Sequence, residues 1–152
     1  MNSPEDARSE FRKSFSAWQK AYKPVSLVLA IAFLAVGTLF LIFPEAVVNL
    51  FNALSRTLGM VESNEQGNDF YRILAVGYMY VVTLLAYQMY RHPGDEKFLW
   101  LLVNAKGASS VLSFLFFVLH HPYLIYLTNG IVDGGIAVGL VVLRMKTRRN
   151  QQ

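Results

Sequence analysis

The sequence predicts an all-α integral membrane protein, a four-helix bundle with two further amphipathic helices at the membrane surface. Hydrophobic residues make up 54% of the 152 residues and charged residues only 16%, which is more apolar than a typical soluble domain. The charges leave four stretches almost bare, at residues 25–43, 70–90, 98–119 and 123–143. Each stretch has the length of a membrane-spanning helix. A soluble bundle would need a polar outer face on each helix, and these stretches largely lack one.

Residues 1–23 precede the first span and are polar, with aromatic residues at helical spacing. We expect a cytoplasmic amphipathic arm on the membrane surface, with its aromatic face toward the lipid and its basic face toward anionic headgroups. A docking helix for a protein partner is the alternative interpretation. The aromatic residues are Phe11, Phe15, Trp18 and Tyr22, and the basic ones are Arg12, Lys13, Lys20 and Lys23.

Residues 24–144 contain the four spans, and the segment after the first span predicts a second amphipathic helix. Pro44 suits a first helical position and Glu45 suits the positive end of the helix dipole. Gly59 is a natural stop. We expect residues 44–58 to be an interfacial connecting helix, with a lid over the bundle as the alternative. Its apolar face would hold Val47, Leu50, Phe51, Leu54 and Leu58.

The placement of lysine and arginine predicts the orientation of the chain. The arm, the turn at 91–97 and the tail at 145–152 are all basic, whereas residues 44–69 carry only Arg56 with several acidic residues. Basic loops stay on the cytoplasmic side. The chain is therefore predicted to be a multi-pass protein of the cell inner membrane with both termini cytoplasmic. The net charge of +4 has the same explanation, so no nucleic-acid partner is predicted.

Two charges lie deep inside the predicted spans. Lys106 is about eight residues into the third span, and Asp133 is about ten residues into the fourth. Both positions are roughly 12–15 Å from the cytoplasmic face. The connection at 120–122 is so short that the two helices must be antiparallel neighbours. Because an unpaired charge at this depth is costly, we expect Lys106 and Asp133 to form an ion pair.

Other polar residues extend this candidate site. Ser110 follows Lys106 by one turn, and Asn129 precedes Asp133 by one turn. Asn104 adds a second small and polar face, and Arg72 opens the second span, where it would snorkel outward or bind an anionic head group. A structural ion-pair network that fixes helix register and a functional polar pocket or proton-relay element both remain open.

Several classes of site are not predicted. The chain has no cysteine, which excludes disulfides and thiolate metal sites. His92 falls on the cytoplasmic side, whereas His120 and His121 fall at the outer turn, so they are a poor metal signature. No phosphate-binding loop, zinc-protease motif or nucleophile elbow is present. We therefore predict no metal, no cofactor and no catalytic residue.

The layout resembles the small four-helix bacterial membrane proteins of the DoxX-like kind. The resemblance covers residues 25–143 and rests on layout more than on a specific signature. The features are Phe-Pro-Glu at 43–45, Arg72, Asn-Ala-Lys-Gly-Ala-Ser-Ser at 104–110 and Gly-Ile-Val-Asp-Gly-Gly at 130–135. The resemblance implies membrane subunits of quinone-linked oxidoreductases for some members and gives no functional residue to this chain.

The sequence favours a non-enzymatic membrane module that uses the Lys106/Asp133 cluster. Such a module would be an accessory subunit, or a binder of lipid, quinone or another lipophilic small molecule. The alternative is a membrane enzyme component or small transporter that uses the cluster as a substrate or proton site. The expected partners are the lipid bilayer and either a lipophilic molecule or a partner membrane subunit, with a homo-oligomer left open.

Overall fold

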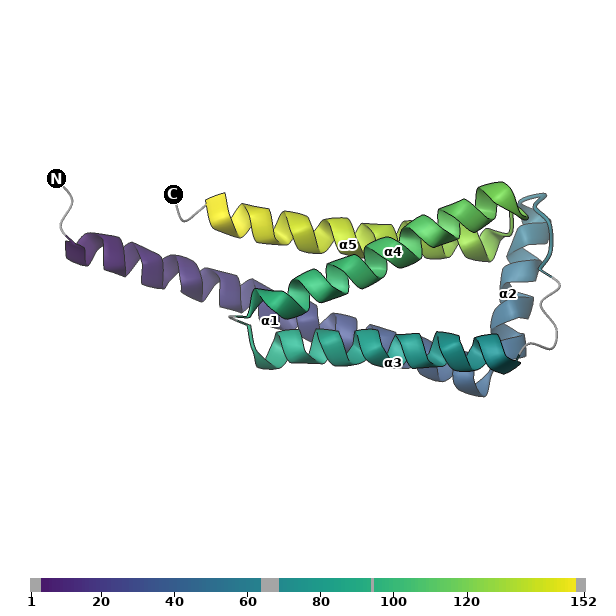
Figure 1. Cartoon of the computed structure of the whole chain (residues 1–152), viewed down its shortest axis with the longest axis horizontal. Coiled ribbons are helices and arrows are strands. Elements are labelled where there is room, and N and C mark those ends of the chain that lie inside the picture. Colours follow the sequence, from purple (N-terminus) through teal and green to yellow (C-terminus); the bar gives the residue numbers. More distant parts are fainter. Residues whose placement is uncertain (1–3, 64–68, 94, 150–152) are drawn as a thin grey trace.

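The computed structural model of the chain describes residues 4–63, 69–93 and 95–149, with side chains for 22–63, 73–93 and 95–145. Within these ranges the chain forms five α-helices and no strand (Figure 1). The helices are α1 (Pro4–Ile42), α2 (Pro44–Thr57), α3 (Asp69–Arg91), α4 (Glu96–Leu119) and α5 (Leu124–Arg149). Four of them, α1, α3, α4 and α5, are long and apolar enough to cross a membrane. The all-α prediction with four apolar helices is confirmed.

Helix α1 differs from the expectation at its start. The sequence predicted a short amphipathic helix within residues 1–23, separate from the span at residues 25–43. The structure instead has one continuous helix of 39 residues with Pro24 inside it. Figure 1 shows its first part projecting beyond the other helices. Tyr22, which the sequence placed on the lipid-facing aromatic side of the arm, is instead buried in the bundle core at 1% exposure. The aromatic and basic side chains of residues 4–21 lie outside the described side chains, so the rest of the predicted amphipathic face stays a prediction.

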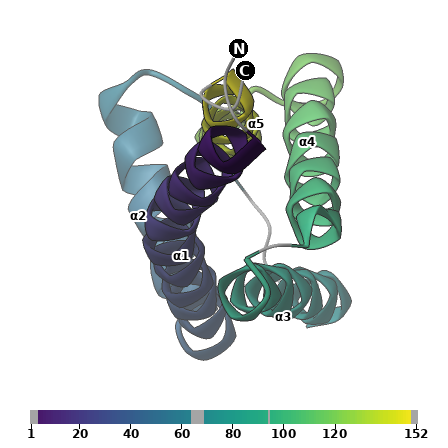
Figure 2. The same cartoon turned by 90° about the vertical axis from the view of Figure 1, so that its left-hand side faces the viewer.

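The four long helices run alternately in opposite directions around a shared core. Helix α1 packs along α3, α4 packs along α5, and α3 also contacts α4 (Figures 1 and 2). The core residues are Tyr22, Ala30, Phe33, Val82, Ala86, Met89, Leu99, Leu102 and Leu140. Close helix approach accompanies this packing: a Cβ on Gly37 of α1 would stand 3.0 Å from Met79 Cβ of α3.

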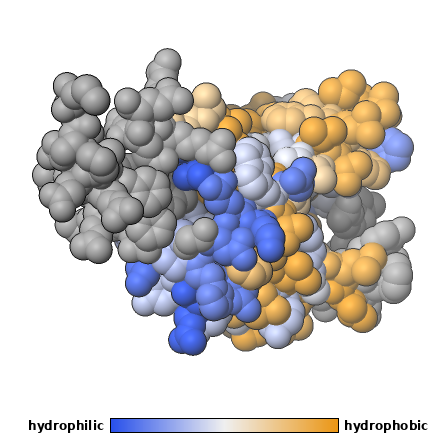
Figure 3. Space-filling model, turned by 60° about the vertical axis from the view of Figure 1, so that its left-hand side comes forward, coloured by the Kyte–Doolittle hydropathy of each residue, from blue (hydrophilic) through white to orange (hydrophobic). Residues whose placement is uncertain are grey.

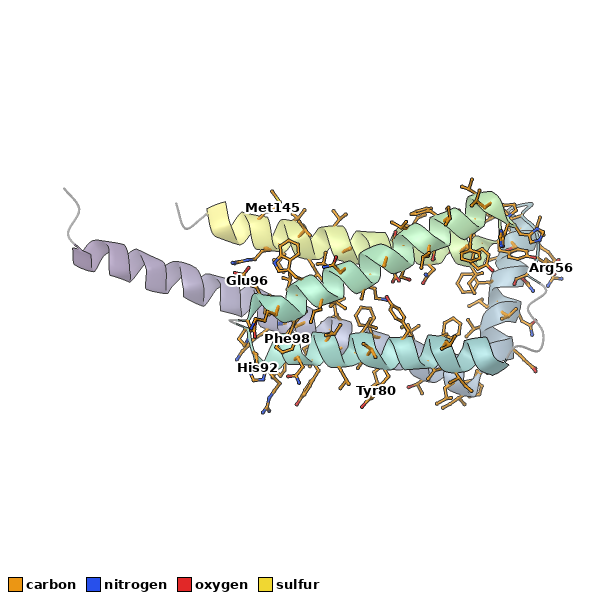
Figure 4. All side chains as sticks on the ribbon, in the orientation of Figure 1. Arg56, Tyr80, His92, Glu96, Phe98 and Met145 are labelled. Atoms are coloured by element: carbon orange, nitrogen blue, oxygen red, sulfur yellow. The ribbon has the colours of Figure 1, made fainter. Side chains whose placement is uncertain are left out.

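The outer surface of the bundle is largely apolar. Val28 and Ile31 of α1 are 64% and 59% exposed, and Tyr80 of α3 points away from the bundle (Figure 4). Figure 3 shows the hydrophilic residues gathered at the end of the bundle that holds the α3–α4 turn, with hydrophobic residues along the flank. A flank of this kind is suited to lipid.

Helix α2 lies across the opposite end of the bundle, where it contacts α1 and α5 (Figure 1). The predicted stop at Gly59 is confirmed: its φ is 68°, and the Met60 amide donates to the Ser55 carbonyl at 2.9 Å. This is a Schellman-type helix end, in which glycine adopts the left-handed conformation without a Cβ penalty. The Asn52 side chain then holds the following loop through two hydrogen bonds with the backbone of Ser63.

In the structure, one part of the predicted apolar face of α2 is buried against the bundle and the other part is exposed. Val47 and Phe51 are partly buried, and Ser55 beside them is fully buried. Leu50, Leu54 and Leu58 are 68%, 50% and 59% exposed. The outward part of this face therefore has no partner within the described chain.

The close contact between α4 and α5 depends on two of the four glycines of α5. Their spacing of four, between Gly130 and Gly134 and between Gly135 and Gly139, predicts close backbone approach. A Cβ on Gly134 would lie 2.8 Å from Ser110 Oγ, and a Cβ on Gly130 would lie 3.1 Å from the Phe114 ring. Gly135 meets no atom within 4 Å, and neither does Gly139. The prediction of close backbone approach thus holds for Gly130 and Gly134 and is wrong for the other pair.

These neighbouring glycines give a matched test of the packing. Gly134→Ala should destabilise the protein in detergent by about 1–3 kcal/mol, because the new methyl group displaces the Ser110 hydroxyl from its partner. Gly135→Ala should be neutral or stabilising by up to about 1 kcal/mol, since alanine favours a helix and nothing is in its way. Thermal unfolding followed by circular dichroism measures both. Equal effects of the two substitutions would contradict this packing.

Candidate polar site in the bundle core

The centre of the candidate site is a buried ion pair between α4 and α5. Lys106 Nζ donates a hydrogen bond to Asp133 Oδ1 at 2.8 Å. The two side chains are 2% and 4% exposed. The pairing that the sequence predicted from depth and from the short α4–α5 turn is confirmed. Because both charges are withdrawn from solvent, each depends on the other for compensation.

The Lys106 ammonium also contacts aromatic rings from the other two long helices. Its Nζ lies 4.5 Å from the ring centroid of Phe33 on α1 and 5.1 Å from that of Tyr78 on α3. Rings at such distances attract a cation through their negative faces, more strongly when the cation is desolvated. All four long helices therefore meet at one ammonium group. The sequence analysis did not assign either aromatic residue to the site. Tyr78 could have been identified, because it places a hydroxyl group in the middle of an apolar span.

A hydrogen-bonded layer connects α4 and α5 next to the ion pair. The Ser110 hydroxyl donates to the Gly130 carbonyl at 2.7 Å. The Asn129 amide donates to Ser113 Oγ at 2.7 Å and to Ser109 Oγ at 3.3 Å. The predicted polar stripe on α4 and the asparagine on α5 are thus brought together. Ser110 and Asn129 join Lys106 and Asp133 in one continuous polar cluster.

Two candidate residues do not join this cluster. Asn104 is exposed, and its amide donates to the Trp100 carbonyl of its own helix at 2.8 Å. It lies two residues before Lys106, which places it about 200° around the helix. Asn104 therefore lies on the second small and polar face that the sequence predicted for it, and not in the core site. The side chain of Arg72 lies outside the described side chains, so its predicted role stays a prediction.

The ion pair leaves hydrogen-bonding capacity in the core. Among the described residues, no donor reaches Asp133 Oδ2, although this oxygen is buried. A buried acceptor without a partner costs about 1–3 kcal/mol. Lys106 likewise makes one hydrogen bond within this part of the chain, out of the three that an ammonium can donate. The pair can accept a further hydroxyl group, a water molecule or a proton.

A cavity of about 390 Å³, broadly open to the surface of the bundle, lies between α3, α4 and α5 beside this cluster. Its wall is mostly apolar and carries the hydroxyl-bearing residues Tyr78, Ser109, Ser113 and Tyr126. The other lining residues are Ala105, Ala108, Leu112 and Phe116. Tyr78 belongs both to the cavity wall and to the Lys106 site, and its hydroxyl donates to the Ala105 carbonyl at 3.0 Å. The cavity and the ion pair are therefore adjacent.

A second ion pair joins α4 and α5 at the end of the bundle that holds the α3–α4 turn. Arg144, which the sequence assigned only to the orientation of the chain, bonds to Glu96, and their side chains are 11% and 37% exposed. Figure 4 places Glu96 near the last turns of α5. This contact fixes the relative position of the two helices at the end far from their short turn.

The histidines lie against aromatic rings at opposite ends of the bundle. His92 lies 6.1 Å from the Phe98 ring, and His120 meets the Phe116 ring edge-on at 5.0 Å. The described part of the chain contains no group of three histidine or acidic side chains that could hold a metal ion. These histidines are surface groups packed on rings.

Comparison with protein-family models, curated proteins and solved structures gives no match. The DoxX-like resemblance therefore stays a prediction from the sequence layout.

A double-mutant cycle tests the coupling within the ion pair. Lys106→Met and Asp133→Leu should each lower the free energy of unfolding by about 3–5 kcal/mol, because each leaves one buried charge without its partner. The double variant should recover much of that loss. The same cycle on the exposed Arg56–Glu62 pair, whose charged atoms are 3.4 Å apart, should give a coupling of about 0–1 kcal/mol. A coupling energy near zero in the Lys106–Asp133 cycle would show that the two residues act independently.

Proposed function

We propose that this protein is a non-enzymatic membrane module that binds a lipophilic small molecule in the cavity beside the Lys106–Asp133 pair. The observation that carries the proposal is the composition of the cavity wall. A mostly apolar surface with a few placed hydroxyl groups is typical of sites for lipophilic ligands with a polar group. The hydroxyls of Tyr78 and Ser109 would orient that group, and Phe116 would contact the apolar body.

The shape of the cavity supports an elongated ligand. Its α4 residues extend from Ala105 to Phe116, which corresponds to about 16 Å along the helix. A lipid tail, a quinone or a long-chain alcohol has this form. A role as the accessory subunit of a membrane complex is compatible with such a site, because the bound molecule would be presented at the flank of the bundle.

The alternative function is a membrane enzyme component or small transporter that uses the ion pair itself. The free Oδ2 of Asp133 favours this alternative, since it can hold a proton or accept a hydrogen bond from a substrate. A water-filled route from one membrane face to Asp133 would distinguish it from the binding module.

Photolabelling tests the binding module. A diazirine-bearing hexadecanol should crosslink to α3–α5 peptides, and Leu112→Trp should reduce the yield severalfold because the indole fills the cavity. Leu74→Trp is the control, since Leu74 and Leu112 are both 53% exposed and only Leu112 lines the cavity. Equal yields in the two variants would reject this cavity as the binding site and favour the alternative function.

The membrane orientation is part of the proposal. We infer that the chain crosses the cell inner membrane four times with both termini cytoplasmic, and that α2 lies at the outer interface. The basic termini and the basic α3–α4 turn support this orientation. The exposed leucines of α2 support its interfacial position.

Because the chain has no cysteine, single cysteines can test the orientation. An impermeant maleimide should label Val61→Cys in intact spheroplasts, since the loop after α2 would face outward. It should label Gln152→Cys only after permeabilisation. Leu34→Cys, within a span, should react in neither condition. Labelling of Gln152→Cys before permeabilisation would contradict a cytoplasmic C-terminus.

A further inference from the structure

The face of α4 that points away from the core has no partner within the described chain. Its residues recur at alternating spacings of three and four, and every one of them is exposed. This is the spacing of any single face of an α-helix, and a helix seam uses such a face. We call this set the α4 outer face; it consists of Leu101, Asn104, Ala108, Val111, Leu115 and Val118.

Asn104 distinguishes this face from an ordinary lipid-facing surface. It lies eight residues beyond Glu96, the start of α4, which is about 12 Å along the helix. One amide N–H donates to the Trp100 carbonyl. Within the described chain, no hydrogen bond is made by the second N–H or by the side-chain oxygen. An amide in hydrocarbon without partners is costly, and in membranes asparagine commonly bonds across a helix pair.

The side chains beside Asn104 are small, so another helix can approach closely at this point. A groove of about 500 Å³ runs between α4 and α5 there, lined by Asn104, Gly107, Ala108 and Val138 among others. A Cβ on Gly107 would meet no atom within 4 Å. Small residues of this kind let helix backbones come close and strengthen the packing between membrane helices.

We propose that a second copy of this chain docks on the α4 outer face, with the two α4 helices packed side by side. Two copies in one membrane share the same orientation, so a two-fold axis normal to the membrane makes these helices parallel. Equivalent residues then face each other. Asn104 of one copy meets Asn104 of the other, and each amide donates to the other's oxygen. A single asparagine in a helix seam specifies such parallel pairs.

This interface and the cavity lie on neighbouring faces of α4. The cavity opens between α3, α4 and α5, and Ala108 is the residue of the α4 outer face that also lines it. The dimer can therefore be tested with the cavity-lining residues unchanged.

Cysteine crosslinking locates the interface. Val111→Cys lies on the α4 outer face, and Leu34→Cys lies on α1; the native residues are 66% and 57% exposed. Both positions are eight residues from the outer ends of their helices, Leu119 and Ile42. In dilute lipid vesicles, copper phenanthroline should yield several times more disulfide-linked dimer with Val111→Cys. Equal yields would mean random collision and would overturn the proposal.

Energy transfer between labelled copies tests the amide. Asn104→Leu keeps the size of the side chain and removes its hydrogen bonds, so the dimer dissociation constant in vesicles should rise about tenfold. Asn104→Gln should retain most of the association. Circular dichroism should be unchanged in both variants, because Asn104 is exposed. A dissociation constant that is the same for Asn104→Leu and the native chain would overturn the proposal.

Discussion

The buried ammonium of Lys106 is the constraint on which the rest of the bundle depends. A charge in an apolar interior is tolerated only with compensation, and each long helix supplies part of it. Asp133 supplies the counter-charge, and Phe33 and Tyr78 supply ring faces. An apolar bundle can slide or rotate its helices at little cost because its contacts are non-directional. A shared cation sets the depth and rotation of all four helices at one level.

The polar groups around this ammonium also give the bundle an internal asymmetry. Between Lys106 and the α4–α5 turn lie the layer of serine and asparagine side chains and the cavity. Between Lys106 and the Arg144–Glu96 pair, at the other end, the core is filled by apolar residues such as Leu99 and Leu102. A ligand in the cavity would touch Tyr78, which itself contacts Lys106. A ligand that moved the Tyr78 ring would therefore also change the contact between that ring and the Lys106 ammonium.

The sequence predicted the parts of this site that depend on rare residues and short connections. Lys106 and Asp133 could be paired because charges are scarce in the spans and the turn at 120–122 fixes the register of α4 and α5. Phe33 could not be identified, since it is one of 11 phenylalanines and no short turn relates α1 to α4. Helical periodicity alone separates Asn104 from Lys106, which is why the two lie on different faces of α4. The arm expected at residues 1–23 is continuous with the first span in the structure, since a change from polar to apolar composition does not by itself end a helix.

The continuity of α1 has a consequence for the charges near the N-terminus. Its 39 residues give a rod about 58 Å long, roughly twice the thickness of the hydrocarbon core. With Tyr22–Ile42 spanning the bilayer, the preceding residues leave the membrane along the direction of the span. Position 12 is then about 15 Å beyond Tyr22 along the axis, nearly two Debye lengths at physiological salt. In the proposed membrane orientation, basic groups at that distance would be largely screened from anionic headgroups, and the first turns of α1 would form a stalk in the aqueous phase.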